Sequence, residues 1–236
     1  MFLGAVYLFL FSAILSAQTV RPLIDENRVG GPGKVAKGKI EYYNDTLDSL
    51  FVTLDSRSFS VSEKGELSYR PMVASLHVKF SAMSFRVLPK QSYFVFYEAS
   101  ADALPSWFVV YATFSGFKQR TAEGFKIQIQ LPHTVYLLPN QKVRKDELLL
   151  RVAEFQSDRK KILLRVENSG TAFGRVLEAD ASSGRKHSIQ GGFPVFPQAV
   201  REIEIPWEES DAPQKITLRL DSFTLEHSIE EKPKQE

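Results

Sequence analysis

Short runs of alternating apolar and polar residues recur along this chain, and they limit the folds that it can adopt. Phe125, Ile127 and Ile129 lie on one face of such a run and polar residues on the other, which is the period of a half-buried strand. Helical periodicity is hard to find. Further runs rich in β-branched and aromatic residues, separated by turn residues, lie at 37–43, 50–54, 75–80, 92–97 and 107–114. The pattern predicts an all-β fold.

A second series of strand-like runs begins near residue 148. Its members are 148–155, 161–166, 174–178, 200–205, 215–220 and 222–229. A polar stretch that begins with Pro139-Asn140 separates the two series. Short strands at a spacing of about 8–12 residues are typical of antiparallel sandwiches. We therefore expect two immunoglobulin-like β-sandwich domains, residues 18–143 and 144–229, followed by a charged tail, residues 230–236.

The N-terminus has the composition of an export signal. Residues 1–17 contain no charged residue, and the apolar run is shorter than the roughly 20 residues of a membrane-spanning helix. It ends in Leu15-Ser16-Ala17, which resembles a cleavage site. No basic residue precedes the apolar run, and Leu15 stands where a small residue is usual, so an uncleaved anchor is the alternative. We predict a cleaved signal peptide, residues 1–17, and export from the cytoplasm.

Composition and motifs give little support for catalysis. The 30 Lys and Arg residues nearly balance the 28 Asp and Glu residues, which argues against a nucleic-acid partner. The absence of Cys excludes disulfides and thiolate metal sites. The four His residues are scattered, and the phosphate-loop-like residues 33–39 lead into Ile40, where Ser or Thr is needed. We expect no enzyme, metal, cofactor or small-molecule substrate, although a site built from residues distant in sequence stays open.

Several sequence blocks are similar, in their order, to those of periplasmic pilus-assembly chaperones. The first-domain blocks are Val20–Leu23, Asn27-Arg28-Val29, a strand ending in Asn44, Ser84–Pro89, Leu104-Pro105 and an alternating strand that ends at Pro139. In the second half, Asn168 ends a strand and a Pro-rich block follows at 192–197. The resemblance covers about residues 20–225.

This resemblance implies a fold, a compartment and a function. The fold is two immunoglobulin-like sandwiches set at an angle, with a cleft between them. The function is binding in the periplasm: the chaperone adds one of its own strands to an exported, incomplete pilin-like subunit, which is β-augmentation, and so prevents aggregation of the exposed edge. An outer-membrane usher is a further partner that the resemblance suggests.

The resemblance also assigns residues to the binding of the subunit. Phe125, Ile127 and Ile129 fall on the donor strand, although their alternation fits equally well a strand that faces the protein's own core. Arg28 takes the position of an Arg that holds the subunit's terminal carboxylate, although it fits equally a plain surface residue next to the Gly-rich turn. Thr134 stands where the family has its Lys, so the anchor lacks one charge.

Pro132 is a second departure from the family, because proline lacks the amide that a strand ladder uses. A non-catalytic structural or adhesive envelope protein that reuses the same fold is therefore the alternative function.

Overall fold

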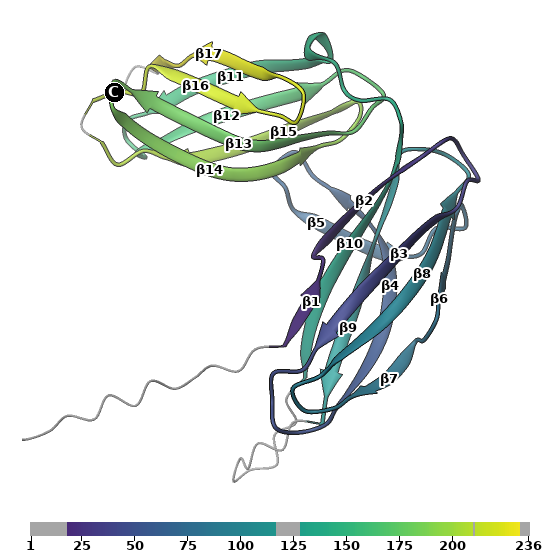
Figure 1. Cartoon of the computed structure of the whole chain (residues 1–236). Helices are drawn as coiled ribbons and strands as arrows, with labels where there is room; N and C mark the ends of the chain where they lie inside the picture. The colour runs from purple at the N-terminus through teal and green to yellow at the C-terminus, as the bar shows by residue number, and fades with distance from the viewer. Residues whose placement is uncertain (1–17, 117–127, 210, 232–236) are drawn as a thin grey trace, which may run out of the picture.

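The computed structural model of the chain (Figure 1) describes residues 18–116, 128–209 and 211–231. The predicted signal peptide, Phe125, Ile127 and most of the charged tail lie outside these residues. The described residues form strands and one short 3-10 turn, η1 (Lys145–Glu147), so the predicted all-β class is confirmed. In this part of the chain, no helix has the length and apolar character that a membrane span requires.

The first domain is a sandwich of two sheets. One sheet contains, in spatial order, β1 (Thr19–Arg21), β3 (Ala36–Tyr43), β8 (Ser92–Ala101) and β6 (Leu76–Phe80). The other contains β2 (Ile24–Val29), β10 (Ile129–Pro139), β9 (Ser106–Ser115), β4 (Leu50–Val61) and β5 (Leu67–Pro71), with β7 (Ser84–Val87) also paired to β4. Fully buried side chains such as Ile40, Val95 and Phe108 fill the space between the sheets.

The second domain is also a sandwich. One sheet has the order β15 (Ala199–Pro206), β12 (Lys161–Asn168), β11 (Leu148–Gln156) and β18 (Glu230–Glu231). The other has the order β14 (Lys186–Val195), β13 (Gly174–Ser183), β16 (Lys215–Arg219) and β17 (Thr224–Ser228). The core surrounds Trp207, whose indole N–H donates to the carbonyl of Asp211 at 2.7 Å.

Two boundaries differ from the expectation. Val143, which we placed in the first domain, packs into the core of the second. Glu230 and Glu231, which we assigned to the tail, pair in parallel with β11. The second sandwich therefore extends beyond both of its predicted ends.

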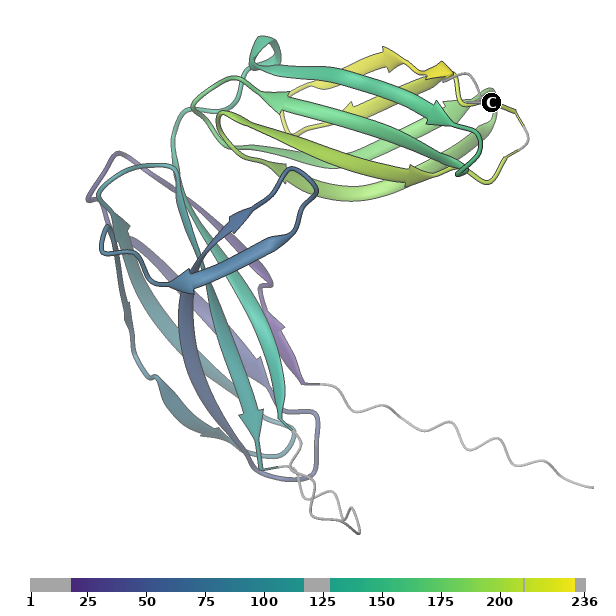
Figure 2. The same cartoon turned by 180° about the vertical axis from the view of Figure 1, so that it is seen from behind.

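An apolar cluster joins the two sandwiches, which lie at an angle to each other (Figures 1 and 2). The ring centroids of Trp107 and Phe196 lie 4.5 Å apart, and those of Tyr136 and Phe173 lie 4.8 Å apart. Arg175 of β13 makes an ion pair with Glu26 of β2 beside these rings. Because its rings are largely buried, the cluster stabilises one relative orientation of the domains.

The same buried asparagine motif occurs once in each sandwich. Asn44 is fully buried; its amide nitrogen donates to three carbonyls, the shortest contact being 2.7 Å to Asp48, and its oxygen accepts from Thr46. Asn168 is fully buried as well, donates to the carbonyls of Ala172 and Val195, and accepts from the amide of Gly170. Each Asn thus satisfies backbone groups of the loop that follows its strand and carbonyls at the end of another strand, β7 or β14.

His133 is buried where the N-terminal strand crosses from one sheet to the other. Its Nδ1–H donates to the carbonyl of Pro22 at 2.5 Å, and its Nε2 is buried without a hydrogen-bond partner. The Tyr97 hydroxyl, whose ring is close by, donates to Asp25 at 2.6 Å. Burial lowers the pKa of His133 below its ordinary value, although the hydrogen bond to Pro22 and the charge of Asp25 oppose this shift.

We predict that Asn44→Ala destabilises the first sandwich by about 1–3 kcal/mol, because it leaves buried carbonyls without donors. Chemical denaturation monitored by fluorescence measures the change as a lower transition midpoint. Asn140→Ala, at an exposed position, is the matched control and should leave the midpoint unchanged. Equal midpoints for Asn44→Ala and Asn140→Ala would contradict the anchoring role.

We also predict that His133 makes the stability depend on pH. The folded state binds the His133 proton more weakly than the unfolded chain, whose pKa is about 6.5. The contribution of His133 is therefore greatest above pH 6.5 and is lost as the pH falls, by at most about 1.4 kcal/mol per pH unit.

Denaturation midpoints between pH 5 and 8 measure this dependence. His133→Phe should reduce the change of the midpoint with pH below pH 6.5, independently of the absolute stability of the variant. His227→Gln, at an exposed position, should not reduce it. A slope that persists in His133→Phe would assign the pH dependence to other groups.

Candidate functional site

The first half of β10 has an open edge. On one side β10 pairs with β9 along most of its length, from Ile129 to Leu137. On the other side its pairing with β2 begins only at Thr134 and runs in parallel to Pro139. Within residues 18–116, 128–209 and 211–231, no strand pairs with this second side of residues 129–133. An unpaired edge of this kind is a template for another strand.

The backbone alternation shows which groups this edge presents. The amide of Thr134 donates to the carbonyl of Leu23 at 2.9 Å, on the side away from β9. Because the direction of the amides alternates along a strand, the amide of Gln130 faces the same open side. Pro132 also faces that side. Its missing N–H is therefore a donor lost from the open edge, and the hydrogen bonds between β10 and β9 do not need it.

The side chains of β10 divide between two surroundings. Ile129 and Leu131 are half-buried against the core of the first sandwich, where Val135 and Leu137 are fully buried. The alternate residues face the cleft, where Tyr136 and Leu138 join the interdomain cluster.

Ile129 therefore faces the protein's own core, which is one of the two alternatives that its alternation left open. This position is compatible with strand donation, because a strand added to the open edge would continue the same sheet and share its faces. Phe125 and Ile127 lie outside the described residues, so their role as donor residues stays a prediction.

Arg28 and Thr134 lie on adjacent strands but not beside each other. Leu138 is the register partner of Arg28, and Ile24 is that of Thr134, so four residues, or about 13 Å, separate the two along the sheet. The guanidinium of Arg28 donates to the carbonyls of Pro139 and Gln141. The predicted pair is therefore not brought together around one carboxylate.

Thr134 lines a cavity of about 270 Å³ between the domains. The hairpin formed by β4 and β5 forms one wall, and Figure 2 shows it projecting from the first sandwich towards the second. The other walls come from β9, β10 and the second domain; the lining side chains are Phe59, Val61, Leu67, Tyr69, Val109, Pro132, Tyr136, Pro194 and Arg201. Most of this lining is apolar, and Arg201 is its only Lys, Arg, Asp or Glu side chain.

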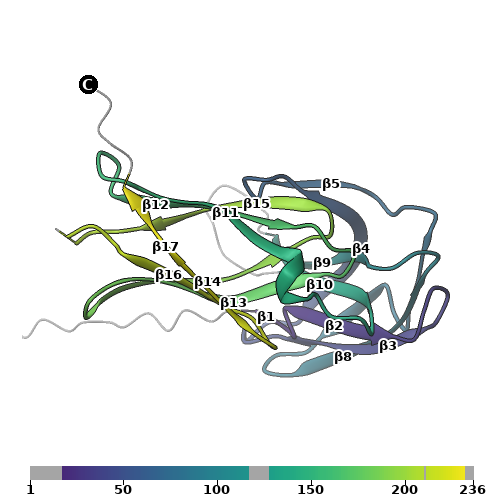
Figure 3. The ribbon, with the colours of Figure 1, turned by 90° about the horizontal axis from the view of Figure 1, so that it is seen from above.

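The turn of the hairpin is bound to the second domain. The amide of Glu202 donates to the carbonyl of Glu63 at 2.7 Å, and Arg165 makes an ion pair with the side chain of Glu63 at 3.1 Å. Figure 3 shows β5 and β15 near each other where these contacts form. These contacts could not be predicted from the sequence, because the residues that make them are more than 100 positions apart.

Comparisons with known proteins agree with this architecture. No family model matches the sequence, and no curated protein matches it. Solved structures do match. One match is a chain in the complex of the Salmonella enterica SafA pilin with the SafB chaperone, which is 14% identical. The match covers 91% of this chain and 97% of that one, with a TM-score of 0.55.

Two further matches are of the same kind. A chain in the Acinetobacter baumannii complex of the CsuC chaperone with the tip subunit CsuE is 11% identical, with 92% of this chain covering all of that one and a TM-score of 0.52. The Escherichia coli chaperone DraB is 12% identical, with 91% and 97% covered and a TM-score of 0.51. The chain therefore has the fold of the PapD-like fimbrial chaperones: two immunoglobulin-like sandwiches joined at an angle.

Proposed function

We propose that this protein is a periplasmic chaperone that binds an exported pilin-like subunit by adding the edge of β10 to it. The observation that carries the proposal is the open edge at residues 129–133, beside the cleft of a fold that SafB and CsuC share. SafB was solved in complex with a pilin, and CsuC in a pre-assembly complex with a tip subunit. The proposed activity is therefore binding, as in these two complexes.

The chemistry of strand addition follows from the geometry of the edge. Gln130 offers an outward amide and carbonyl, and Pro132 offers a carbonyl only. Apolar residues of the donor strand, for which we propose Phe125, Ile127 and Ile129, would fill the subunit's groove. Each side chain of this size contributes about 1.5–3 kcal/mol when it becomes fully buried. Covering the subunit's own exposed edge would prevent its aggregation.

The carboxylate anchor remains part of the proposal in a modified form. Arg28 can bind a carboxylate at the end of the cleft near Gln141, and the hydroxyl of Thr134 can donate one hydrogen bond inside the cavity. The guanidinium of Arg28 is directed towards Pro139 and Gln141 and away from Thr134, so the two side chains do not converge on one site. An outer-membrane usher as a further partner rests on the resemblance alone.

A structural or adhesive envelope protein is the second candidate. Two observations favour it: Pro132 removes an amide from the open edge, and Thr134 supplies no charge. This candidate predicts no subunit partner and retention of residues 1–17.

We predict that Gln130→Pro weakens subunit binding by about tenfold or more, because it removes the outward amide of the open edge and places a second ring there. Gln130→Ala keeps the amide and is the matched control. Subunit captured from periplasmic extracts of the natural host, quantified by mass spectrometry, gives the comparison. Equal capture by both variants would argue against pairing at this edge.

We further predict that Ile127→Asp abolishes the complex while the protein stays folded, because it places a charge in an apolar groove. The tagged full-length protein and its variant would be purified from the host, and circular dichroism would check the fold. Loss of one small exported β-rich protein in the variant supports strand donation. Recovery of the protein alone, with residues 1–17 still attached, supports the envelope alternative.

A further inference from the structure

β15 lies at the edge of its sheet. In the part of the chain that the structure describes, it pairs with β12 on one side and with no strand on the other. The amide of Glu202 faces the outer side, because it donates to the carbonyl of Glu63 in the turn of the β4–β5 hairpin. Since amide directions alternate along a strand, the amides of Val200 and Glu204 face outward as well. An edge of this kind can pair with a foreign strand unless something covers it.

The last residue of β15 is already protected against such pairing. Pro206 has no amide to offer, and its carbonyl accepts a hydrogen bond from the Ser188 hydroxyl at 2.6 Å. The middle of the edge, around Glu202, therefore depends on the hairpin for its cover.

The tip of the hairpin, residues 62–65, is shaped to fit against this edge. Gly65 has a φ of +87°, which residues with a side chain rarely adopt, and its amide donates to the carbonyl of Ser62 at 2.9 Å. The guanidinium of Arg201 packs on the bare backbone of Gly65, where a Cβ would collide with it. Its Nη1 also donates to the carbonyl of Glu63 at 3.2 Å.

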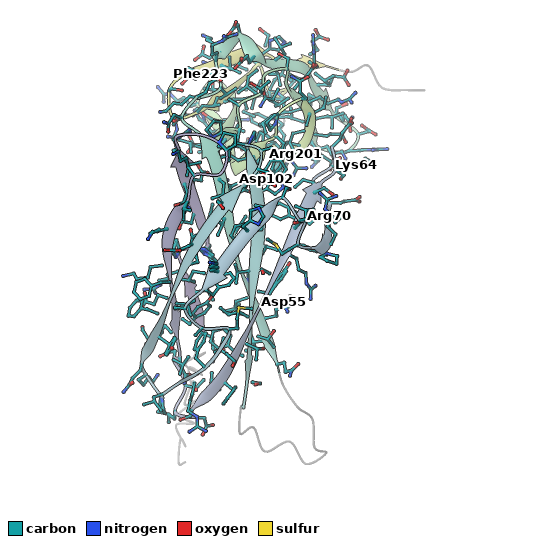
Figure 4. All side chains as sticks on the ribbon, turned by 90° about the vertical axis from the view of Figure 1, so that its right-hand side faces the viewer. Asp55, Lys64, Arg70, Asp102, Arg201 and Phe223 are labelled. Carbon is teal, nitrogen blue, oxygen red and sulfur yellow. The ribbon has the colours of Figure 1, made fainter. Side chains whose placement is uncertain are left out.

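The hairpin leaves its own sheet before it reaches the second domain. β4 pairs with β9 only as far as Arg57, and residues 58–61 pair with β5 alone among the described strands. Phe59 anchors this two-stranded ribbon, because its ring belongs to the interdomain cluster and its carbonyl accepts from the Trp107 indole at 2.9 Å. Such a ribbon is marginally stable by itself, so its tip depends on the second domain. Figure 4 shows Lys64 of the tip where the two sandwiches meet.

The contacts that hold the tip are polar and partly exposed. Arg165 pairs with Glu63 at 3.1 Å, and the exposed fractions of the two side chains are 41% and 59%. Exposed ion pairs contribute little to stability and are screened by salt. A cavity of about 440 Å³, lined in part by Lys64, Glu202 and Glu204, lies beside the tip. Because the interdomain cluster is apolar and buried, the tip can separate from β15 while the domains stay joined.

We propose that the tip of the β4–β5 hairpin is a latch that reversibly covers the edge of β15 and closes one side of the interdomain cavity. When closed, the latch satisfies the outward amide of Glu202 and blocks strand pairing at the second domain. When the latch opens, that edge becomes available, and the cavity loses the wall that Gly65, Leu67 and Tyr69 provide. The latch does not involve the open edge of β10, on which the proposed function rests, so either can fail without the other.

Amide hydrogen exchange of the full-length protein, followed by NMR, tests the latch. As NaCl rises from about 0.05 M to about 0.5 M, screening of the Arg165–Glu63 pair should make the amide of Glu202 exchange about two- to fivefold faster. The amide of Ile203 faces β12, because amide directions alternate, and it should keep its rate. It is the internal reference for opening of the whole domain.

Glu63→Gln removes the ion pair but keeps the carbonyl that accepts from Glu202. At low salt it should raise the exchange rate of the Glu202 amide by about the same factor, and it should abolish the dependence on salt. Glu98→Gln is the matched control, because Glu98 makes a similarly exposed pair with Lys37, at 2.7 Å, within the first domain. It should change neither the rate nor its dependence on salt.

Two outcomes of this experiment would overturn the inference. Exchange of the Glu202 amide that responds neither to salt nor to Glu63→Gln would show that the tip does not open on its own. Equal acceleration of Glu202 and Ile203 would assign the effect to opening of the second domain as a whole. The salt comparison uses the wild-type protein alone, so it does not depend on the folding of a variant.

Limited proteolysis gives a second readout, because trypsin cleaves after Lys64 at the tip. Arg201→Met leaves the hairpin sequence unchanged and removes a donor to its turn, so it should speed this cleavage about threefold or more. Arg151→Met, which removes an exposed arginine paired with Glu167 on the same domain, is the matched control and should leave the rate unchanged. Equal cleavage rates after Lys64 in the wild type and both variants would also overturn the inference.

Discussion

The packing of aromatic rings between the two sandwiches is the interaction on which the rest of the structure depends. Tyr136 and Leu138 reach this cluster from β10, and Phe173 and Phe196 reach it from the second domain. Because the cluster includes alternate residues of β10, this strand packs into the core of the first sandwich with one face and contacts the second domain with the other. The angle between the domains and the cavity between them both depend on this contact surface.

The open edge of β10 is a consequence of how the N-terminal strand crosses between the sheets. β1 pairs with β3 in one sheet, and β2 pairs with β10 in the other. Had the whole strand stayed beside β10, the edge would be covered. The crossing leaves one side of residues 129–133 without a paired strand in the part of the chain that the structure describes, and it buries His133 against the carbonyl of Pro22. Pro132 at this edge weakens it as a template for indiscriminate pairing, which is a common means of protecting an edge strand.

Sequence patterns predicted the elements whose side chains alternate and missed those whose backbone is irregular. The runs at 37–43 and 107–114 correspond to β3 and β9, because in each of them one face is buried. β14 was missed, because Gly191, Gly192 and Pro194 are typical of turns. The structure gives the reason for Gly192: a Cβ there would lie 2.6 Å from the carbonyl oxygen of Val176 on the neighbouring strand β13. The contact of Arg201 with the hairpin turn could not be predicted from sequence, because the two lie about 140 residues apart.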